Sequence, residues 1–208
     1  GCGFYKLALL FMIGAFLGDL AETVFCRLTA GVWMSRSSVV WGPFSIVWGL
    51  AIAIATKMLY NYRERSDGFL FVLGTVLGGA YEYLCSVFTE LVFGMVFWDY
   101  SDIPFNLGGR INLLYCFFWG IAAVIWLKKC YPRLSNLIER LPMKVGKGLT
   151  WCLVLFMVCN ITLSVLALAR QSARTAGKSA ANCAELWLDK HYNDEVMNQI
   201  YPNSIPTN

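Results

Sequence analysis

Charged residues are scarce in this chain: Asp, Glu, Lys and Arg together make up 14% of its 208 residues, whereas soluble domains carry about a quarter. Hydrophobic residues make up 58%, and several uninterrupted apolar runs reach the roughly 20 residues that cross a bilayer core. The scarcity of charge excludes an ordinary soluble domain, and the apolar runs predict an integral membrane protein.

Residues that bind metals or perform hydrolysis are also few. The chain has one histidine, His191, and its eight cysteines form no C-x-x-C pair, so a zinc or haem site is not expected. It contains no H-E-x-x-H motif and no G-x-x-x-x-G-K-[ST] phosphate loop. We therefore expect no metal and no cofactor, name no catalytic residue, and assign any ATP hydrolysis to a separate subunit.

The net charge of +4 does not indicate nucleic-acid binding. The basic residues lie in short loops between apolar runs, which is the usual pattern of a membrane protein with a defined orientation. No basic face of a folded soluble domain can be recognised. We expect no nucleic-acid partner.

The apolar runs predict helices, because a bilayer-spanning segment must satisfy its own backbone hydrogen bonds and these runs lack the two-residue alternation of barrel strands. We expect an all-α, multi-pass bundle over residues 1–170, followed by a polar helical tail over residues 171–208, with no internal repeat and no second domain. About five spanning helices are predicted, over residues 4–26, 41–60, 68–97, 107–127 and 148–169. Apolar residues at helical spacing also predict a short helix on the membrane surface over residues 133–141.

Two pairs of glycines have the spacing of close helix contacts. Gly14-x-x-x-Gly18 lies in the first predicted helix and Gly74-x-x-x-Gly78 in the third. Small residues at this spacing allow two membrane helices to approach closely. The alternative is a chance recurrence in a chain that contains 18 glycines.

Acidic residues occur inside the predicted spans, where ionisable groups are costly and rarely face lipid. Glu22 lies near the end of the first helix. In the third helix Glu82, Ser86 and Glu90 recur every four residues, which places them along one stripe. The stripe favours a polar cavity over a single structural hydrogen bond, whereas Glu22 could instead lie at headgroup level and pair with Arg27.

The stretch from Trp98 to Arg110 is a polar interval between two apolar runs. It mixes aromatic, acidic, amide and guanidinium groups, and its Pro and paired Gly predict a turn. We expect this stretch to hold Asp99 and Asn106 inward and to close the mouth of the carboxylate-lined cavity.

The distribution of Lys and Arg predicts the orientation. More of them lie in the segments before the first, third and fifth helices than in the other loops, which places the amino terminus in the cytoplasm and the tail outside. The candidate substrate-binding residues, which gather at the outer end or along the polar stripe that leads to it, are Glu22, Arg36, Glu82, Glu90, Trp98, Asp99, Tyr100, Asn106, Arg110, Arg170 and Arg174. The alternative is a ring of headgroup-level charges.

Several short motifs resemble one known family, the bacterial CmpB-type integral membrane proteins described as type IV ABC-transporter permeases. The matching motifs are Gly18-Asp19-Leu20-Ala21-Glu22, Arg36, Gly42-Pro43, the stretch from Glu82 to Glu90, Trp98-Asp99-Tyr100-Ser101, Phe105-Asn106, Gly109-Arg110-Ile111, Trp119-Gly120 and Tyr201-Pro202-Asn203. The resemblance implies a multi-pass protein of the bacterial inner membrane. The family's Pro-Ile-Tyr-Gly-like element is replaced here by Ser45-Ile46-Val47-Trp48-Gly49.

Three functions are compatible with these features. The first is an ABC-type permease with an outward-facing, carboxylate-lined cavity, whose partners are membrane lipids, a separate ATPase subunit and further subunits of a homo- or hetero-oligomer. The second is an enzyme acting on a lipid at the outer leaflet, with Asp99 or Glu22 as general base and Arg110, Arg170 and Arg174 clamping a phosphate. The third is an accessory subunit whose polar loop is only a lid.

Overall fold

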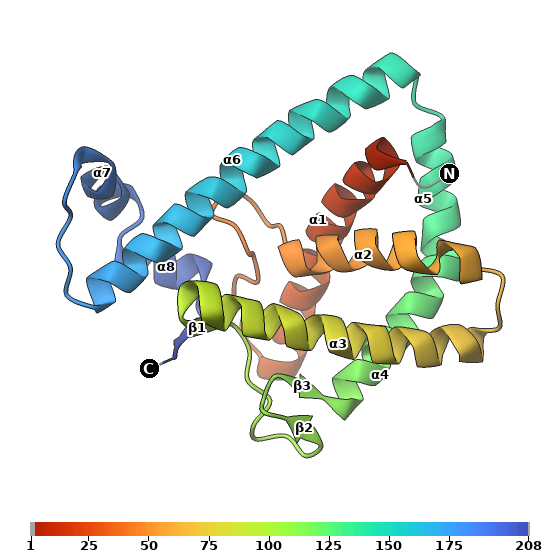
Figure 1. Ribbon diagram of the computed structural model, residues 1–208, viewed down its shortest axis with the longest axis horizontal. Helices are drawn as coiled ribbons and strands as arrows, with labels where there is room; N and C mark the ends of the chain where they lie inside the picture. The colour runs from red at the N-terminus through yellow and green to blue at the C-terminus, as the bar shows by residue number, and fades with distance from the viewer. Residues whose placement is uncertain (1–2, 208) are drawn as a thin grey trace.

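The computed structural model describes residues 3–207, and nearly all of the regular structure in that range is helical (Figure 1). Four of the described helices are long and apolar enough to cross a membrane: α1 (Phe4–Ala30), α3 (Asp67–Phe93), the continuous helix Leu113–Glu139, and α6 (Met143–Thr175). A shorter apolar helix, α2 (Ile46–Leu59), continues into the turn η1 (Tyr60–Tyr62). The predicted all-α membrane bundle is confirmed.

The helix Leu113–Glu139 is continuous, whereas the sequence predicts a spanning helix over 107–127 and a short surface helix over 133–141 as separate elements. It consists of α4 (Leu113–Ile125), the wider π-helical turn η2 (Trp126–Cys130) and α5 (Tyr131–Glu139). Pro132 lies in the first turn of α5. A proline lacks the N–H that an α-helix uses, and a π-helical turn accommodates such an interruption without ending the helix. The short helix predicted over 133–141 is present as α5, but it continues the long helix Leu113–Glu139 and is not a separate segment.

Two helices begin later than the sequence suggests, because local turns precede them. The second begins at Ile46 rather than Trp41, since Ser45 accepts a hydrogen bond from the Trp48 N–H at 3.3 Å and acts as its N-cap. The fourth begins at Leu113 rather than 107. The residues before it form a hairpin of β2 (Asn106–Leu107) and β3 (Ile111–Asn112), with Gly108 and Gly109 at positive φ.

The helices pair as two hairpins, α1 with α2 and α3 with α4. Added Cβ atoms at Gly14 and Gly18 would lie 2.5 and 2.3 Å from side-chain atoms of α2, and those at Gly74 and Gly78 equally close to side chains of α4. Both glycine pairs therefore mark close helix contacts, as predicted.

The two hairpins use the same residues at the same spacing. In α1 the set is Phe11, Gly14, Gly18 and Glu22, and in α3 it is Phe71, Gly74, Gly78 and Glu82, each 60 positions later. Gly18 packs against Trp48, which precedes Gly49 in α2. In the same way Gly78 packs against Trp119, which precedes Gly120 in α4. Gly49 and Gly120 in turn meet Phe11 and Phe71. The prediction of no internal repeat is therefore wrong.

The bundle has two distinct ends. At the basic end, which comprises residues 3–6, 57–67 and 128–147, Lys6 donates to Ser135 at 2.8 Å and pairs with Glu139, while Lys128 donates to the Arg65 carbonyl at 2.7 Å. The loop end comprises residues 27–45, 94–112 and 171–207. There, the Trp41 N–H donates to Asn160 at 3.0 Å, and the Tyr201 hydroxyl donates to the Ser38 carbonyl at 2.8 Å.

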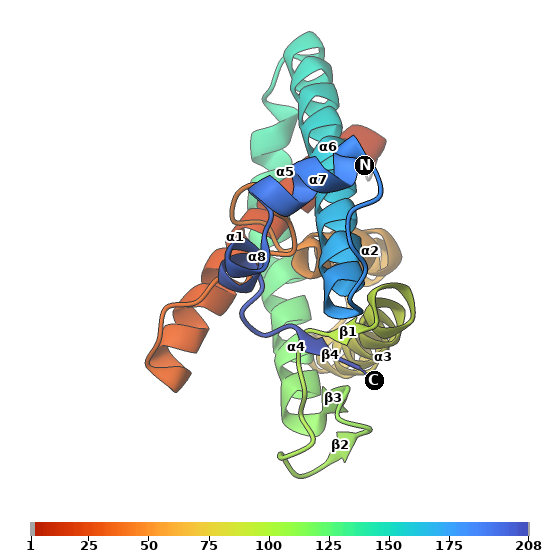
Figure 2. The same cartoon turned by 90° about the vertical axis from the view of Figure 1, so that its left-hand side faces the viewer.

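The tail folds back onto the loop end. It contains α7 (Cys183–His191), α8 (Asp194–Ile200) and β4 (Ile205–Pro206), and β4 pairs antiparallel with β1 (Met95–Val96) (Figure 2). A buried cluster joins the tail to α6 and to β1; its members are Met95, Ala167, Leu168, Met197 and Tyr201. The tail is therefore part of the wall at the loop end.

Candidate functional site

A cavity of about 840 Å³ opens at the loop end. It is formed by the ends of α1 and α2, the middle of α3, the start of α4, the Trp98–Tyr100 stretch and the last residues of the tail. The lining residues are Ala21, Glu22, Phe25, Cys26, Arg36, Trp48, Glu82, Phe97, Trp98, Asp99, Tyr100, Tyr115, Phe118, Trp119, Pro202, Asn203, Ser204 and Ile205. The volume lies within the roughly 300–1,000 Å³ of sites for small organic ligands.

Glu82 is the most deeply placed acidic group of this cavity, with only 6% of its surface exposed. One carboxyl oxygen accepts from the Tyr100 hydroxyl at 2.7 Å and the other from the Trp119 indole N–H at 3.0 Å. Tyr100 stacks on Tyr115 with ring centroids 5.0 Å apart. Burial, together with the nearby Glu82 carboxylate, raises the pKa of the Tyr100 hydroxyl, so Tyr100 acts as a neutral donor.

Glu22 occupies the equivalent position in the first hairpin. It accepts from the Trp48 indole N–H at 2.7 Å and from the Arg36 guanidinium at 3.1 Å. The rings of Trp48 and Trp119 lie against each other, with centroids 5.0 Å apart. The repeat thus brings two Glu–Trp pairs to one cavity. They differ because Glu22 has a cationic partner, whereas Glu82 has two neutral donors.

Asp99 and Trp98 reach the cavity from the loop. Asp99 accepts from the Ser101 N–H at 2.9 Å and from its hydroxyl at 2.5 Å, and these two donors lower the pKa of the Asp99 carboxyl. The Trp98 indole donates to the Arg110 carbonyl at 2.9 Å. Asp99 therefore lies exposed at the rim of the cavity, bonded to its own loop, whereas the sequence predicted that the turn would hold it inward.

Five of the predicted site residues lie outside the lining. Three of them, Glu90, Asn106 and Arg110, belong to α3 and the Trp98–Arg110 stretch. Arg110 pairs with Glu90 and donates to the Ser86 hydroxyl at 3.0 Å. Asn106 donates to the Ile103 carbonyl at 2.8 Å and accepts from the Gly109 N–H at 3.0 Å. The contacts of Arg110 connect α3 to the loop, and those of Asn106 stabilise the turn. Asn106 therefore does not face the cavity, contrary to the prediction.

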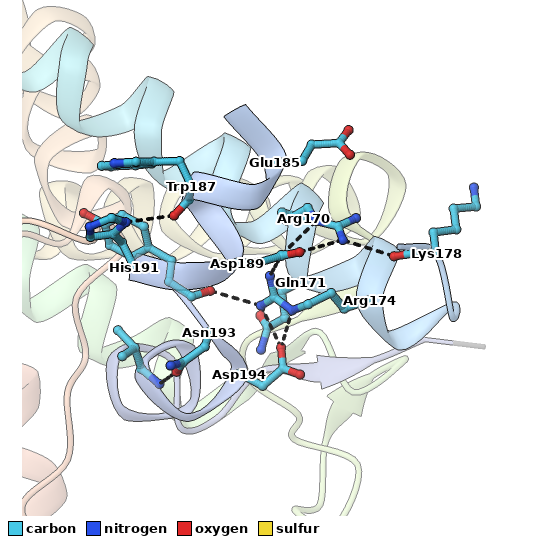
Figure 3. Close-up of polar contacts among 12 residues, drawn as sticks. Arg170, Gln171, Arg174, Lys178, Glu185, Trp187, Asp189, His191, Asn193 and Asp194 are labelled. Atoms are coloured by element: carbon cyan, nitrogen blue, oxygen red, sulfur yellow. Dashed lines mark hydrogen bonds and ion pairs between the residues drawn. The ribbon is translucent and has the colours of Figure 1, made fainter. Parts of the chain in front are cut away.

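Arg170 and Arg174 pair with acidic residues of the tail (Figure 3) and do not line the cavity. Arg170 holds Asp189 with two hydrogen bonds of 2.8 Å, and Arg174 donates to Asp189 at 2.6 Å and to Asp194 at 2.7 Å. Charge-assisted pairs of this bidentate kind have strict geometry. They fasten α7 and α8 to the end of α6.

Replacing Asp189 by Asn should loosen the tail, because both arginines lose the carboxylate that they share. Arg170 lowers the pKa of Asp189 by donating to its ionised form. The contribution of the pair is therefore fully present above the ordinary carboxyl range and is lost as the pH falls through the lowered pKa. Limited proteolysis should show faster cleavage between α6 and α7 in this variant at neutral pH, and in the wild type only in acid.

Asp194 provides the matched control, since its side chain is 61% exposed and pairs with Arg174 alone among the ion pairs of residues 3–207. Asp194→Asn should change the cleavage rate much less. Equal cleavage of the two variants would show that Asp189 is not the anchor.

The structure adds residues that the sequence did not single out as site residues. Trp48, Tyr115 and Trp119 line the cavity, as do Pro202, Asn203, Ser204 and Ile205 of the tail. The recurring Trp-Gly pair, each facing a glycine of the other helix, is the signal that would have found Trp48 and Trp119. Within residues 3–207, no group of three His, Cys, Asp or Glu residues is placed to hold a metal ion.

Comparison with known proteins gives one match. The sequence profile of the CmpB family, described as "Putative ABC-transporter type IV", matches residues 9–165. This range runs from α1 into α6 and includes both hairpins and the Trp98–Arg110 stretch, while the tail lies beyond it. No curated protein and no solved structure matches the chain.

Proposed function

Since the chain belongs to the CmpB family of type IV ABC-transporter proteins, we propose that it is the permease subunit of an ABC-type transporter and that the loop-end cavity receives the transported molecule. The observation that carries this proposal is the pair of carboxylates, Glu22 and Glu82, in a cavity large enough for an organic ligand. Acidic groups inside membrane helices face a bundle interior or a cavity and mark transport pathways in many membrane proteins.

The proposal includes an orientation in the bacterial inner membrane. Lys and Arg side chains collect at the basic end, so the positive-inside rule places that end in the cytoplasm and the cavity and tail outside. The separate ATPase subunit then meets the basic end, where α5 and α6 form an exposed corner with Arg140 and Lys144. Membrane lipids and one or more further membrane subunits complete the assembly.

Nothing in the geometry favours the alternative lipid-modifying enzyme. That hypothesis needs Arg110, Arg170 and Arg174 to converge beside Asp99 or Glu22. Instead, Arg110 pairs with Glu90, while Arg170 and Arg174 pair with acidic residues of the tail. The phosphate clamp is not assembled, so the permease is the better-supported function.

Extraction of the whole chain from its native membrane in a mild detergent tests this proposal. The chain should elute together with a polypeptide that carries a G-x-x-x-x-G-K-[ST] loop, and the eluate should hydrolyse ATP. Lys144→Glu, at the basic end, should weaken this association, whereas Lys190→Glu, an exposed charge of the tail, should not. Elution without such a subunit, even after cross-linking in intact membranes, would rule the permease out.

A further inference from the structure

We propose that the loop-end cavity binds a lipophilic organic cation, whose charge lies at the Glu82 carboxylate and whose body lies against the aromatic wall. This inference rests on the proposed function, because it names the class of molecule that the permease would accept. Four observations support it: the excess of acidic groups in the lining, the lack of a cationic partner for Glu82, the aromatic wall and the size of the cavity.

Acidic side chains outnumber basic ones in the lining. Its titratable side chains include three carboxylates, Glu22, Glu82 and Asp99, and one guanidinium, Arg36. Asp19, one turn before Glu22 on α1, adds a carboxyl group that is 3% exposed and whose Oδ1 has no hydrogen-bond partner. By Coulomb's law this excess of acidic groups favours cations over anions in the cavity.

Glu82 is the carboxylate that lacks a cation. Arg36 compensates Glu22, and Asp99 lies at the exposed rim, bonded to Ser101. Both oxygens of Glu82 accept from neutral groups, and none of the ion pairs among residues 3–207 includes it. A buried carboxylate without a charged partner is costly, and a bound cation would supply the partner that the protein does not.

The repeat explains why the two carboxylates differ. The same hairpin contacts place Glu22 against Trp48 and Glu82 against Trp119. Only the first hairpin adds an arginine, Arg36, from the loop after α1, whereas the second adds Tyr100 from the loop after α3. One of two equivalent sites is thus occupied by an internal guanidinium, and the other is left for an external cation.

The wall of the cavity is aromatic. Trp48, Trp98, Tyr115, Phe118 and Trp119 all line it. Aromatic faces attract cations by about 0.5–2 kcal/mol each, and they favour organic ammonium-type ions, which shed water easily. A small hydrated metal ion is disfavoured, because no three acidic or thiol groups of the described chain converge on one point.

The test measures binding of tetraphenylphosphonium to the purified full-length chain by equilibrium dialysis in a non-ionic detergent. Tetraphenylborate, of the same shape and opposite charge, is the matched ligand. The phosphonium should bind saturably and the borate should not. Saturable binding of both ions, or of neither, overturns the inference whatever happens to any variant.

Variants then locate the charge. Glu82→Gln keeps an acceptor oxygen for Tyr100 or Trp119 and should weaken phosphonium binding about tenfold or more, which corresponds to about 1.4 kcal/mol. Glu82→Asp should retain most of the affinity. Glu64→Gln, an exposed carboxylate at the basic end, should bind as the wild type does. Unchanged binding by a folded Glu82→Gln protein overturns the inference.

The two proposals fail separately. Dialysis needs no ATPase subunit, so a chain that recruits an ATPase but does not prefer the phosphonium is a permease for another class of substrate. A chain that binds the phosphonium but recruits no ATPase supports the cation site and rules out the ABC-type permease.

Discussion

A Gly120→Ala protein is expected to lose the close contact between α3 and α4 and to unfold at a markedly lower temperature than the wild type. The new Cβ would lie 2.2 Å from the Thr75 hydroxyl and 2.6 Å from the Phe71 carbonyl oxygen. The second atom belongs to the backbone of the facing helix, so the helices themselves must separate. Overpacking of this kind destabilises by about 1–3 kcal/mol and sometimes more.

The sign of this effect is informative because alanine is the better helix former by about 1 kcal/mol. Gly148 of α6 has no atom within 4 Å of an added Cβ, so Gly148→Ala should leave the melting temperature unchanged or raise it. Gly49→Ala should behave as Gly120→Ala does, since its Cβ would lie 2.9 Å from the Phe11 carbonyl oxygen. Thermal unfolding in detergent measures all three, with about 2–4 °C for each kcal/mol in a chain of this size.

If Gly120→Ala had the same melting temperature as Gly148→Ala, the close approach of α3 and α4 would be incorrect. If Gly120→Ala were destabilised and Gly49→Ala were not, the two hairpins would not be equivalent.

A Trp119→Ala protein should show the other large effect, because this ring joins the two hairpins. It lies against Trp48 with ring centroids 5.0 Å apart, contacts Tyr81 edge-on at 5.9 Å, and donates to Glu82 at 3.0 Å. Truncating a core tryptophan destabilises by about 3–5 kcal/mol. Trp119 lies partly in the cavity wall, so we expect the lower part of that range.

Trp119→Phe separates packing from hydrogen bonding, since it keeps a ring against Trp48 and removes the donor to Glu82. It should recover most of the stability that Trp119→Ala loses. Trp33→Ala, which removes a loop side chain that is 67% exposed, should melt close to the wild type. Near-ultraviolet circular dichroism should detect the loss of the Trp48–Trp119 ring contact in both Trp119 variants, but not in Trp33→Ala. An Ala variant as stable as the Phe variant would show that the ring does not hold the hairpins together.

The helices were predictable because each apolar run is a local feature of the chain. Runs of this length require helices in a bilayer, whatever their neighbours are. The ends were less predictable. Ser45 caps the second helix, which therefore begins later than predicted. The turn with Gly108 and Gly109 at positive φ moves the start of the fourth helix to Leu113. Pro132 does not end the helix Leu113–Glu139, because the π-helical turn before it accommodates the missing N–H.

The candidate site was predictable in part. Glu22, Arg36, Glu82, Trp98, Asp99 and Tyr100 do line one cavity. Arg170 and Arg174 were wrongly assigned to that cavity because spacing within one helix shows that two side chains share a face, but not which segment covers that face. Only the folded tail reveals that Asp189 and Asp194 cover it.

By itself, the sequence determined that this protein is a helical membrane protein of the CmpB family with acidic residues in its long apolar helices, because composition, run length and motif order are properties of the linear chain. The tertiary structure alone decided which carboxylate is compensated. Arg36 is 14 residues from Glu22 and Tyr100 is 18 from Glu82. Each of these sequence separations includes a loop, so the choice between a charged and a neutral partner depends on how the loops fold over the two hairpins. That choice leaves Glu82 as the buried acidic group of the cavity without a cationic partner.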